Sequence, residues 1–170
     1  MKSKNIIVLF FVLLLLGLSA FFLFDKVQQK QEKKEGYQYI PNFQLPDING
    51  NIITNDSLQK SKMVVFLFIS PDCDFCTEEL KQIKDNQTAL SKEQMVFVST
   101  WTAELIRHFL QEMDFTLTEN MLFLSDERGI LFNAMAIIGS PTVLIYKKGQ
   151  LIKRFDGSVK VETLIKYLSE

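Results

Sequence analysis

An apolar run followed closely by two cysteines constrains the fold of this chain more than any other feature. Residues 63–69 read MVVFLFI, which has the length of a strand and no polar side chain, and Cys73 and Cys76 come shortly after it. A continuous apolar run of strand length is expected where both faces of a sheet are covered. The sequence therefore predicts a buried central strand whose carboxyl end leads into the cysteine pair.

The segments around this run alternate between strand and helix patterns. Two short apolar pieces on either side of Asn49-Gly50, a turn dipeptide, predict a β-hairpin ahead of the run. Buried strands are also expected over residues 95–100, 121–126 and 142–157, the last of these containing two strands joined by a turn. This arrangement places strands on both sides of the cysteine-bearing run.

Three helices are expected between and after these strands, over residues 77–90, 103–113 and 161–169. The apolar spacing of the second helix predicts that four side chains face the core: Leu105, Ile106, Phe109 and Leu110. Strands alternating with helices, followed by a hairpin and a last helix, imply an α/β sandwich with a mixed central sheet.

The amino terminus carries a separate apolar segment. Lys2 and Lys4 precede nineteen uncharged residues, 6–24. At about 1.5 Å per residue, a helix of this length matches a hydrocarbon core of roughly 30 Å, whereas the apolar part of a signal peptide has only about 7–15 residues. A cleavable signal is the alternative, because residues 18–20 (LSA) resemble a small-residue cleavage site. We expect an uncleaved transmembrane anchor over residues 1–24.

A polar segment over residues 25–36 predicts a linker, and residues 37–170 then form one folded domain. A basic tail ahead of an apolar segment is the layout of an export signal, which places the domain in the periplasm or at the outer face of the cytoplasmic membrane. The lysines that follow the apolar segment argue for the opposite orientation. We expect the extracytoplasmic location.

The charge balance excludes one class of partner. Nineteen basic and twenty acidic residues leave a formal charge of −1, and no basic block is interleaved with aromatic residues. A nucleic-acid-binding domain is expected to carry a basic patch. The sequence therefore predicts no nucleic-acid partner.

Three kinds of site are compatible with the cysteine pair. A structural disulfide between residues three apart closes a small loop, and the stabilisation from a disulfide grows with loop length. Zinc needs about four ligands, and beyond the two sulfurs the chain has a single histidine, His108. The third possibility, a redox centre, is favoured by the position of Cys73 where a buried strand gives way to a helix.

At such a junction the free N–H groups of the helix stabilise a thiolate on Cys73, while Cys76 lies one turn deeper. Cys73 is then the nucleophile that attacks a partner disulfide, and Cys76 resolves the mixed disulfide. A second element agrees with this chemistry. Pro141 directly precedes a predicted buried strand, at a point where proline cannot donate a ladder hydrogen bond and where a cis bond would turn the chain tightly.

Together these motifs resemble the thioredoxin superfamily, specifically its membrane-anchored TlpA-like and ResA-like branch, which is related to the AhpC/TSA redoxins. The resemblance rests on the C-x-x-C motif at a strand–helix junction, on Ser140-Pro141-Thr142 before a strand, and on NFQLPDINGN at residues 42–51. It implies a thioredoxin-like sandwich with an N-terminal β-hairpin extension over residues 37–170.

The resemblance also implies roles for individual residues. Cys73 and Cys76 correspond to the exposed and the buried cysteine of a redox-active disulfide, and Pro141 corresponds to the cis-proline beside it. Glu79, three residues after Cys76, corresponds to a glutamate that influences thiol acidity. A solvated first-turn carboxylate is the alternative for Glu79. No cofactor or metal is implied.

The implied substrate-binding residues are Ser140, Phe75 and Asp72. Family members often have tryptophan at the position of Asp72 and proline at that of Phe75, so this chain departs from the family pattern on both sides of Cys73. The expected partners are protein thiols and disulfides, together with a membrane electron donor. Because Asp72 and Asp74 disfavour a thiolate between them, we expect a reductant, with cytochrome c maturation as one example of its use.

Two other functions remain open. Peroxiredoxins share this fold, but their pattern has proline where this chain has Phe66, although Ser70 matches it. A metal-binding chaperone is the remaining alternative. The sequence favours an envelope thiol–disulfide oxidoreductase over both.

Overall fold

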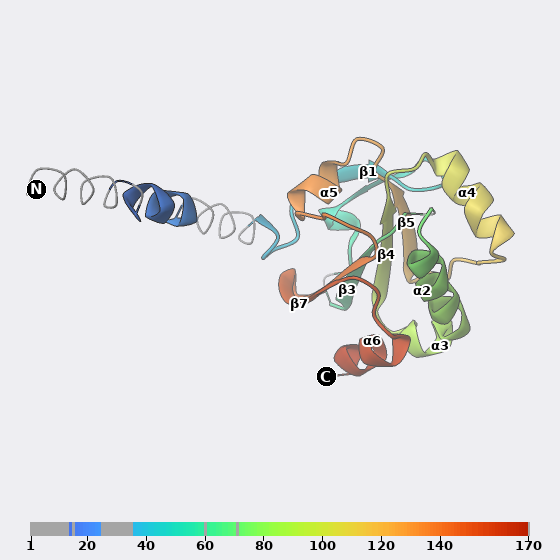
Figure 1. Cartoon of the computed structure of the whole chain (residues 1–170). Helices are drawn as coiled ribbons and strands as arrows, with labels where there is room; N and C mark the ends of the chain where they lie inside the picture. The colour runs from blue at the N-terminus through green and yellow to red at the C-terminus, as the bar shows by residue number, and fades with distance from the viewer. Residues whose placement is uncertain (1–13, 15, 25–35, 60, 71, 170) are drawn as a thin grey trace, which may run out of the picture. The chain divides into compact units, whose positions relative to one another are not determined.

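A five-stranded mixed sheet forms the centre of the protein, which we describe from a computed structural model (Figure 1). The described residues are 14, 16–24, 36–59, 61–70 and 72–169. The strand order is β5-β4-β3-β6-β7. The strands are β3 (Met63–Phe68), β4 (Gln94–Ser99), β5 (Met121–Ser125), β6 (Thr142–Lys147) and β7 (Gln150–Asp156). The strand that leads to the cysteines, β3, is central, parallel to β4 and antiparallel to β6.

Alternate side chains of β3 enter two separate cores. Val65 and Leu67 belong to one core, which is closed by α2 (Asp74–Asp85), α4 (Ala103–Glu112) and α6 (Val161–Leu168). Phe66 and Phe68 belong to the other, which is closed by α5 (Ile130–Ala134) and the amino-terminal segment of the domain. Because both faces of the sheet are covered, β3 has no polar position, as its continuous apolar run predicts.

The predicted hairpin is present as β1 (Gln44–Pro46) and β2 (Ile52–Thr54), which pair antiparallel. Asp47 closes the turn, since its carboxylate accepts hydrogen bonds from the backbone N–H groups of Asn49 and Asn51, each at 2.8 Å. The hairpin also contacts the edge strand, where the Ile48 N–H donates to the Phe123 carbonyl at 3.1 Å. The sandwich with a mixed sheet and an amino-terminal hairpin is confirmed.

Two details differ from the sequence-based expectations. The helix expected over residues 77–90 is two helices, α2 and the short α3 (Gln87–Leu90), because the Asn86 side chain donates to the Gln82 carbonyl at 2.8 Å and ends α2. The expectation that Leu105 faces the core is wrong, since its side chain is 50% exposed. Within α4 the buried stripe runs through Ile106 and Leu110, four residues apart.

The predicted anchor and linker lie mainly outside the described residues. Of residues 1–36, the structure describes 14, 16–24 and 36, and residues 16–24 are helical. Within the described parts of the chain, no helix is both long enough and apolar enough to cross a membrane. The anchor over residues 1–24 and the linker over residues 25–36 stay predictions.

Candidate active site

Cys73 lies at the start of α2, where it is the N-cap residue. Its Sγ accepts a hydrogen bond from the Cys76 backbone N–H at 3.3 Å, and its carbonyl accepts one from the Thr77 N–H at 3.1 Å. The first N–H groups of a helix have no partner within the helix and carry its positive dipole end. The side chain of Cys73 therefore lies at the N-terminal end of a helix, as is typical of a reactive cysteine.

The loop before β6 approaches Cys73 from the other side. Thr142, the first residue of β6, is paired with Phe68 at the end of β3, so the residues just before Thr142 lie beside the cysteine motif. The Cys73 thiol donates to the Ser140 carbonyl at 3.5 Å, and the bond between Ser140 and Pro141 is cis. The structure thus brings Cys73, Ser140 and Pro141 together, although they are far apart in the sequence.

Cys76 differs from Cys73 in its exposure. Cys76 is fully buried on the core-facing side of α2, whereas Cys73 is partly exposed. Both are free thiols. Burial raises the pKa of the Cys76 thiol to about 12, and the hydrogen bond with the Cys73 side chain adds to this effect. A neutral, buried thiol behind an accessible one is the arrangement expected of a resolving cysteine and a nucleophile.

Glu79 lies one turn after Cys76 on the same side of α2, and it is only 2% exposed. Its two carboxylate oxygens have no hydrogen-bond partner among the described residues. Desolvation raises the pKa of Glu79 to about 7, partly offset by a backbone group of Val159. The Glu79 charge in turn contributes to the raised pKa of Cys76. The alternative of a solvated carboxylate is therefore wrong, and a titrating group lies beside the buried thiol.

The predicted substrate-binding residues lie on the rim of this site. Asp72 and Phe75 are both exposed, and the Phe75 side chain is 71% exposed although it is aromatic. The sequence analysis missed Ile138, which is 92% exposed and lies two residues before Ser140. Its place in the same loop as Ser140 and Pro141 was the available sequence signal.

Residues outside this site have structural surroundings. Trp101 packs edge-to-face on Phe109 with ring centroids 6.4 Å apart. His108 is exposed on α4 and pairs with Glu112 at 3.5 Å. Among the described residues, no group of three or more histidine, cysteine or carboxylate side chains is placed to hold a metal ion.

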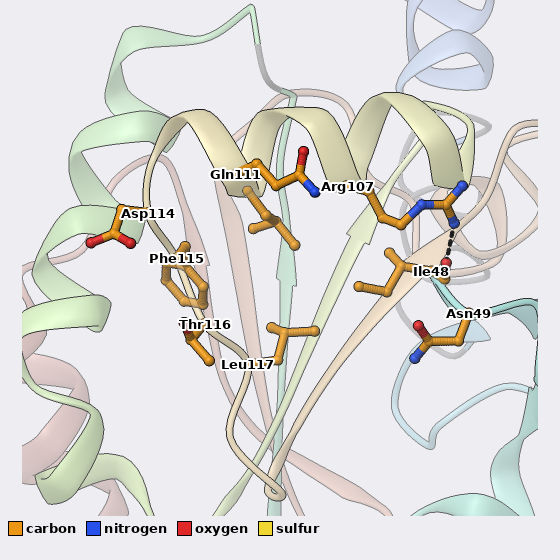
Figure 2. Close-up of a pocket in the computed structure, with 9 residues that line it drawn as sticks. Ile48, Asn49, Arg107, Gln111, Asp114, Phe115, Thr116 and Leu117 are labelled. Carbon is orange, nitrogen blue, oxygen red and sulfur yellow. Dashed lines mark hydrogen bonds between the residues drawn. The ribbon is translucent and has the colours of Figure 1, made fainter.

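Four hollows of the described structure, of about 290 to 570 Å³, have no cysteine among their lining residues. One of about 520 Å³ lies between α4 and the turn of the hairpin (Figure 2). Arg107 of α4 reaches across it and donates to the Ile48 carbonyl, while Leu110 and Phe115 form its apolar side. None of the predicted site residues lines this hollow. The candidate active site is instead a reactive surface at the end of β3.

A model of the AhpC/TSA family matches residues 37–160, which include the cysteine motif, Glu79 and the cis-proline. The chain belongs to the AhpC/TSA family. The match covers most of the chain and confirms the predicted relation to the redoxins. A search of curated proteins found no significant match.

Solved structures similar to this AhpC/TSA protein share its thioredoxin-like fold. A secreted Mycobacterium tuberculosis disulfide oxidoreductase homologous to E. coli DsbE is 19% identical with a TM-score of 0.65, over 79% of this chain and 97% of that one. StoA from Bacillus subtilis is 21% identical with a TM-score of 0.63, over 78% and 99% of the two chains. The peroxidoxin BcpB from M. tuberculosis is 17% identical with a TM-score of 0.65, over 77% and 94%.

A disulfide oxidoreductase and a peroxidoxin thus both appear among the proteins of similar fold. The AhpC/TSA family and the thioredoxin-like fold together support the assignment of the chain as a thiol–disulfide oxidoreductase.

Proposed function

We propose that the chain is an extracytoplasmic, membrane-anchored thiol–disulfide oxidoreductase that reduces disulfides of other proteins through Cys73 and Cys76. The observation that carries this proposal is the placement of an accessible Cys73 thiol at the start of α2, with a buried Cys76 behind it and the Ser140 carbonyl in front. The secreted disulfide oxidoreductase of similar fold supports the extracytoplasmic location. A membrane thiol donor would return the protein to its reduced form.

The reaction begins at Cys73. Its thiolate attacks one sulfur of the partner disulfide, a new disulfide bond forms between the two proteins, and the other partner sulfur leaves as a thiolate that takes up a proton. Cys76 then loses its proton to Glu79 and attacks the Cys73 sulfur, which releases the second partner thiol. Two electrons pass from the dithiol to the partner, and Cys73 and Cys76 remain as a disulfide.

Substrate contacts are assigned to the rim of the site. An extended partner segment would use backbone groups at Ser140. Two exposed apolar side chains lie close along the chain, Phe75 two residues after Cys73 and Ile138 two residues before Ser140. Asp72 adds a negative charge on the same side. Such a rim favours a disulfide within a protein segment over a small disulfide, because a small disulfide is too short to contact all of these groups at once.

The direction of electron flow is proposed from the carboxylates that flank Cys73. Asp72 and Asp74 disfavour a negative charge on the Cys73 sulfur, and a couple whose reduced form gains little from a stabilised thiolate lies toward the reducing end. Replacing both with asparagine should make the reduction potential less negative by tens of millivolts, given that ~30 mV corresponds to ~1.4 kcal/mol. Redox titration against dithiothreitol measures this, and a more negative potential in the double variant would contradict the reductant assignment.

Three measurements distinguish a thiol–disulfide oxidoreductase from a thiol peroxidase and from a metal-binding chaperone. We expect the protein to reduce insulin disulfides in the presence of dithiothreitol, and the Cys73→Ser variant to lack this activity. A thiol peroxidase would instead consume hydrogen peroxide in the presence of dithiothreitol, at a rate comparable to that of insulin reduction. Phe66, at the position where the peroxiredoxin pattern has proline, is fully buried between β4 and β6, which disfavours that alternative. A metal-binding chaperone would retain metal after aerobic purification.

The topology can be measured independently of the chemistry. An alkaline phosphatase fused after Glu170 should be active, because that enzyme requires export to form its disulfides. The fusion should also stay with membranes after carbonate washing and keep its full length, as an uncleaved anchor over residues 1–24 requires. Activity of a reporter that works only in the cytoplasm would contradict the extracytoplasmic placement.

A further inference from the structure

The loop over residues 135–141 carries two of the proposed substrate contacts, the Ser140 carbonyl and Ile138, which is 92% exposed. The end of the loop is fixed just after β7, since the N–H of Gly157, the residue that follows this strand, donates to the Pro141 carbonyl at 2.9 Å. Its start leaves α5 through Ala136, which has a positive φ of 51°. The backbone N–H groups of Met135, Ala136 and Ile137 donate to carbonyls of α5, which ties the start of the loop to that helix. Its hydrogen bonds to the sheet come from a side chain.

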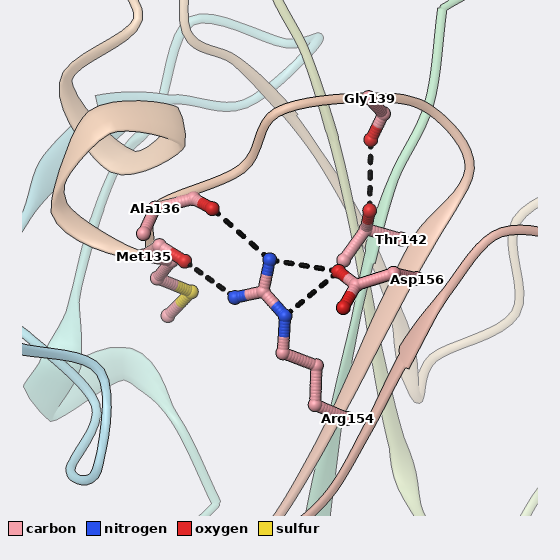
Figure 3. Close-up of polar contacts among 6 residues, drawn as sticks. All are labelled: Met135, Ala136, Gly139, Thr142, Arg154 and Asp156. Atoms are coloured by element: carbon pink, nitrogen blue, oxygen red, sulfur yellow. Dashed lines mark hydrogen bonds and ion pairs between the residues drawn. The ribbon is translucent and has the colours of Figure 1, made fainter. Parts of the chain in front are cut away.

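Arg154 of β7 makes that connection (Figure 3). Its Nη1 donates to the Met135 carbonyl at 2.8 Å and its Nη2 to the Ala136 carbonyl at 3.0 Å. The same guanidinium pairs with Asp156, with both Nε and Nη2 at 2.8 Å from Oδ1. Every nitrogen of the guanidinium is thus used, and the side chain is only 14% exposed.

Two further contacts keep the guanidinium in this orientation. The ring of Tyr37 lies against it, with the ring centroid 4.7 Å from the guanidinium carbon. The Tyr37 carbonyl in turn accepts a hydrogen bond from the hydroxyl of Tyr146 in β6 at 2.8 Å. A planar guanidinium that is stacked on an aromatic ring and bonded along its edge has one orientation, which a lysine at the same position would lack.

We infer that Arg154 is a positioning residue for substrate docking. It fixes the start of the 135–141 loop to β7, while Gly157 fixes the end and the Thr142 hydroxyl donates to the Gly139 carbonyl at 2.8 Å (Figure 3). These bonds together hold the Ser140 carbonyl beside Cys73. Arg154 does not contact the reacting sulfur, and it acts only through the loop. This inference rests on the proposed function, because it gives the loop a role in binding protein disulfides.

The inference separates two kinds of substrate. A protein disulfide has to bind along the loop before Cys73 can attack it, so a loosened loop slows that reaction. A small aromatic disulfide needs only the exposed sulfur of Cys73, so its reaction is insensitive to the loop. Without Arg154 the Met135 and Ala136 carbonyls lose their charged donor, and the loop gains conformations that do not bind substrate.

The test compares Arg154→Met and Arg154→Lys with the wild-type protein in single-turnover oxidation of the reduced form. We expect the rate constant with insulin disulfides to fall about tenfold for Arg154→Met, which is about 1.4 kcal/mol of docking free energy. The rate constant with a small aromatic disulfide should stay within about twofold, and Arg154→Lys should recover only part of the insulin rate. The matched control is Arg107→Met, which removes an arginine that donates to a different backbone carbonyl, far from this loop in sequence.

Hydrogen exchange gives a second measurement that needs no substrate. Amides of residues 137–140 should exchange faster in Arg154→Met and unchanged in Arg107→Met. If Arg154→Met does not fold, Asp156→Asn loosens the same guanidinium while leaving the arginine in place. Equal losses with both disulfides, or faster loop exchange with an unchanged insulin rate, would overturn the inference. A wild-type protein that is inactive toward every disulfide would instead refute the proposed function. Even then, unchanged amide exchange in Arg154→Met would show that Arg154 does not hold the 135–141 loop.

Discussion

Replacing Cys76 with serine will turn the protein into a trap for its partners, whereas replacing Cys73 with serine will leave it unable to attack disulfides. In Cys76→Ser the accessible Cys73 can still form a mixed disulfide, but no second thiol is present to release it. In Cys73→Ser the remaining thiol is buried, and this burial still raises its pKa, which keeps it protonated at neutral pH. We expect insulin reduction to fall by more than about a hundredfold in either variant, because both steps are needed for turnover.

Non-reducing electrophoresis after thiol trapping measures this difference directly. Cys76→Ser should yield adducts with other proteins that disappear on reduction, and the Cys73→Ser and double variants should yield none. Adducts formed by Cys73→Ser in place of Cys76→Ser would reverse the two roles. The double variant serves as the matched control, since it keeps the fold and lacks both sulfurs.

The central part of the fold was predictable because its pattern is extreme. Seven consecutive apolar residues before the cysteines fit only a strand that is covered on both sides, and β3 is such a strand at the centre of the sheet. The hairpin was equally clear from Asn49-Gly50, where Gly50 has a φ of 86° that other residues rarely adopt. In both places local propensity and tertiary packing favour the same structure.

Other features depend on packing that no local pattern contains. Leu105 belongs to an apolar stretch of α4, yet the sheet contacts only the stripe through Ile106 and Leu110. Glu79 occupies a position on the buried side of α2, but a carboxylate is rarely buried without a partner, so the sequence left its burial open. Arg154 belongs to no sequence motif, because the backbone carbonyls to which it donates belong to a loop nearly twenty residues away in the sequence.

The second large effect is expected at Glu79. In the mixed disulfide Cys76 has to lose a proton before it can attack, and a neighbouring base with a pKa of about 7 is matched to that task near neutral pH. Glu79→Gln should slow the resolving step by roughly a hundredfold, the lower end of what a positioned base contributes. The wild-type rate of this step should rise as the pH passes through about 7, whereas the variant should lack that rise.

Rapid acid quenching of the reaction with a protein disulfide separates the two steps. Formation of the mixed disulfide by Cys73 should proceed at the wild-type rate in Glu79→Gln, and its decay should be slow. Glu78→Gln is the matched control, since Glu78 is an exposed neighbour on the same helix. A change in the first step, or an equal effect of Glu78→Gln, would contradict a role in proton transfer to and from Cys76.

Although Glu79→Gln should slow the resolving step, it should make the folded protein more stable above pH 4.5. Glu79 has a pKa of about 7 in the folded protein against an ordinary value of 4.5, so the folded state binds more protons between these values. Ionisation of Glu79 therefore leaves the free energy of unfolding unchanged below pH 4.5 and lowers it progressively as the pH rises toward 7. The loss reaches a plateau of about 3 kcal/mol above pH 7. Urea unfolding should find Glu79→Gln more stable than the wild type at pH 8 and similar to it at pH 4.5. A variant that is slower in resolution and more stable at pH 8 identifies a carboxylate kept for proton transfer, whereas a variant that is less stable at pH 8 would show that Glu79 serves the packing of α2.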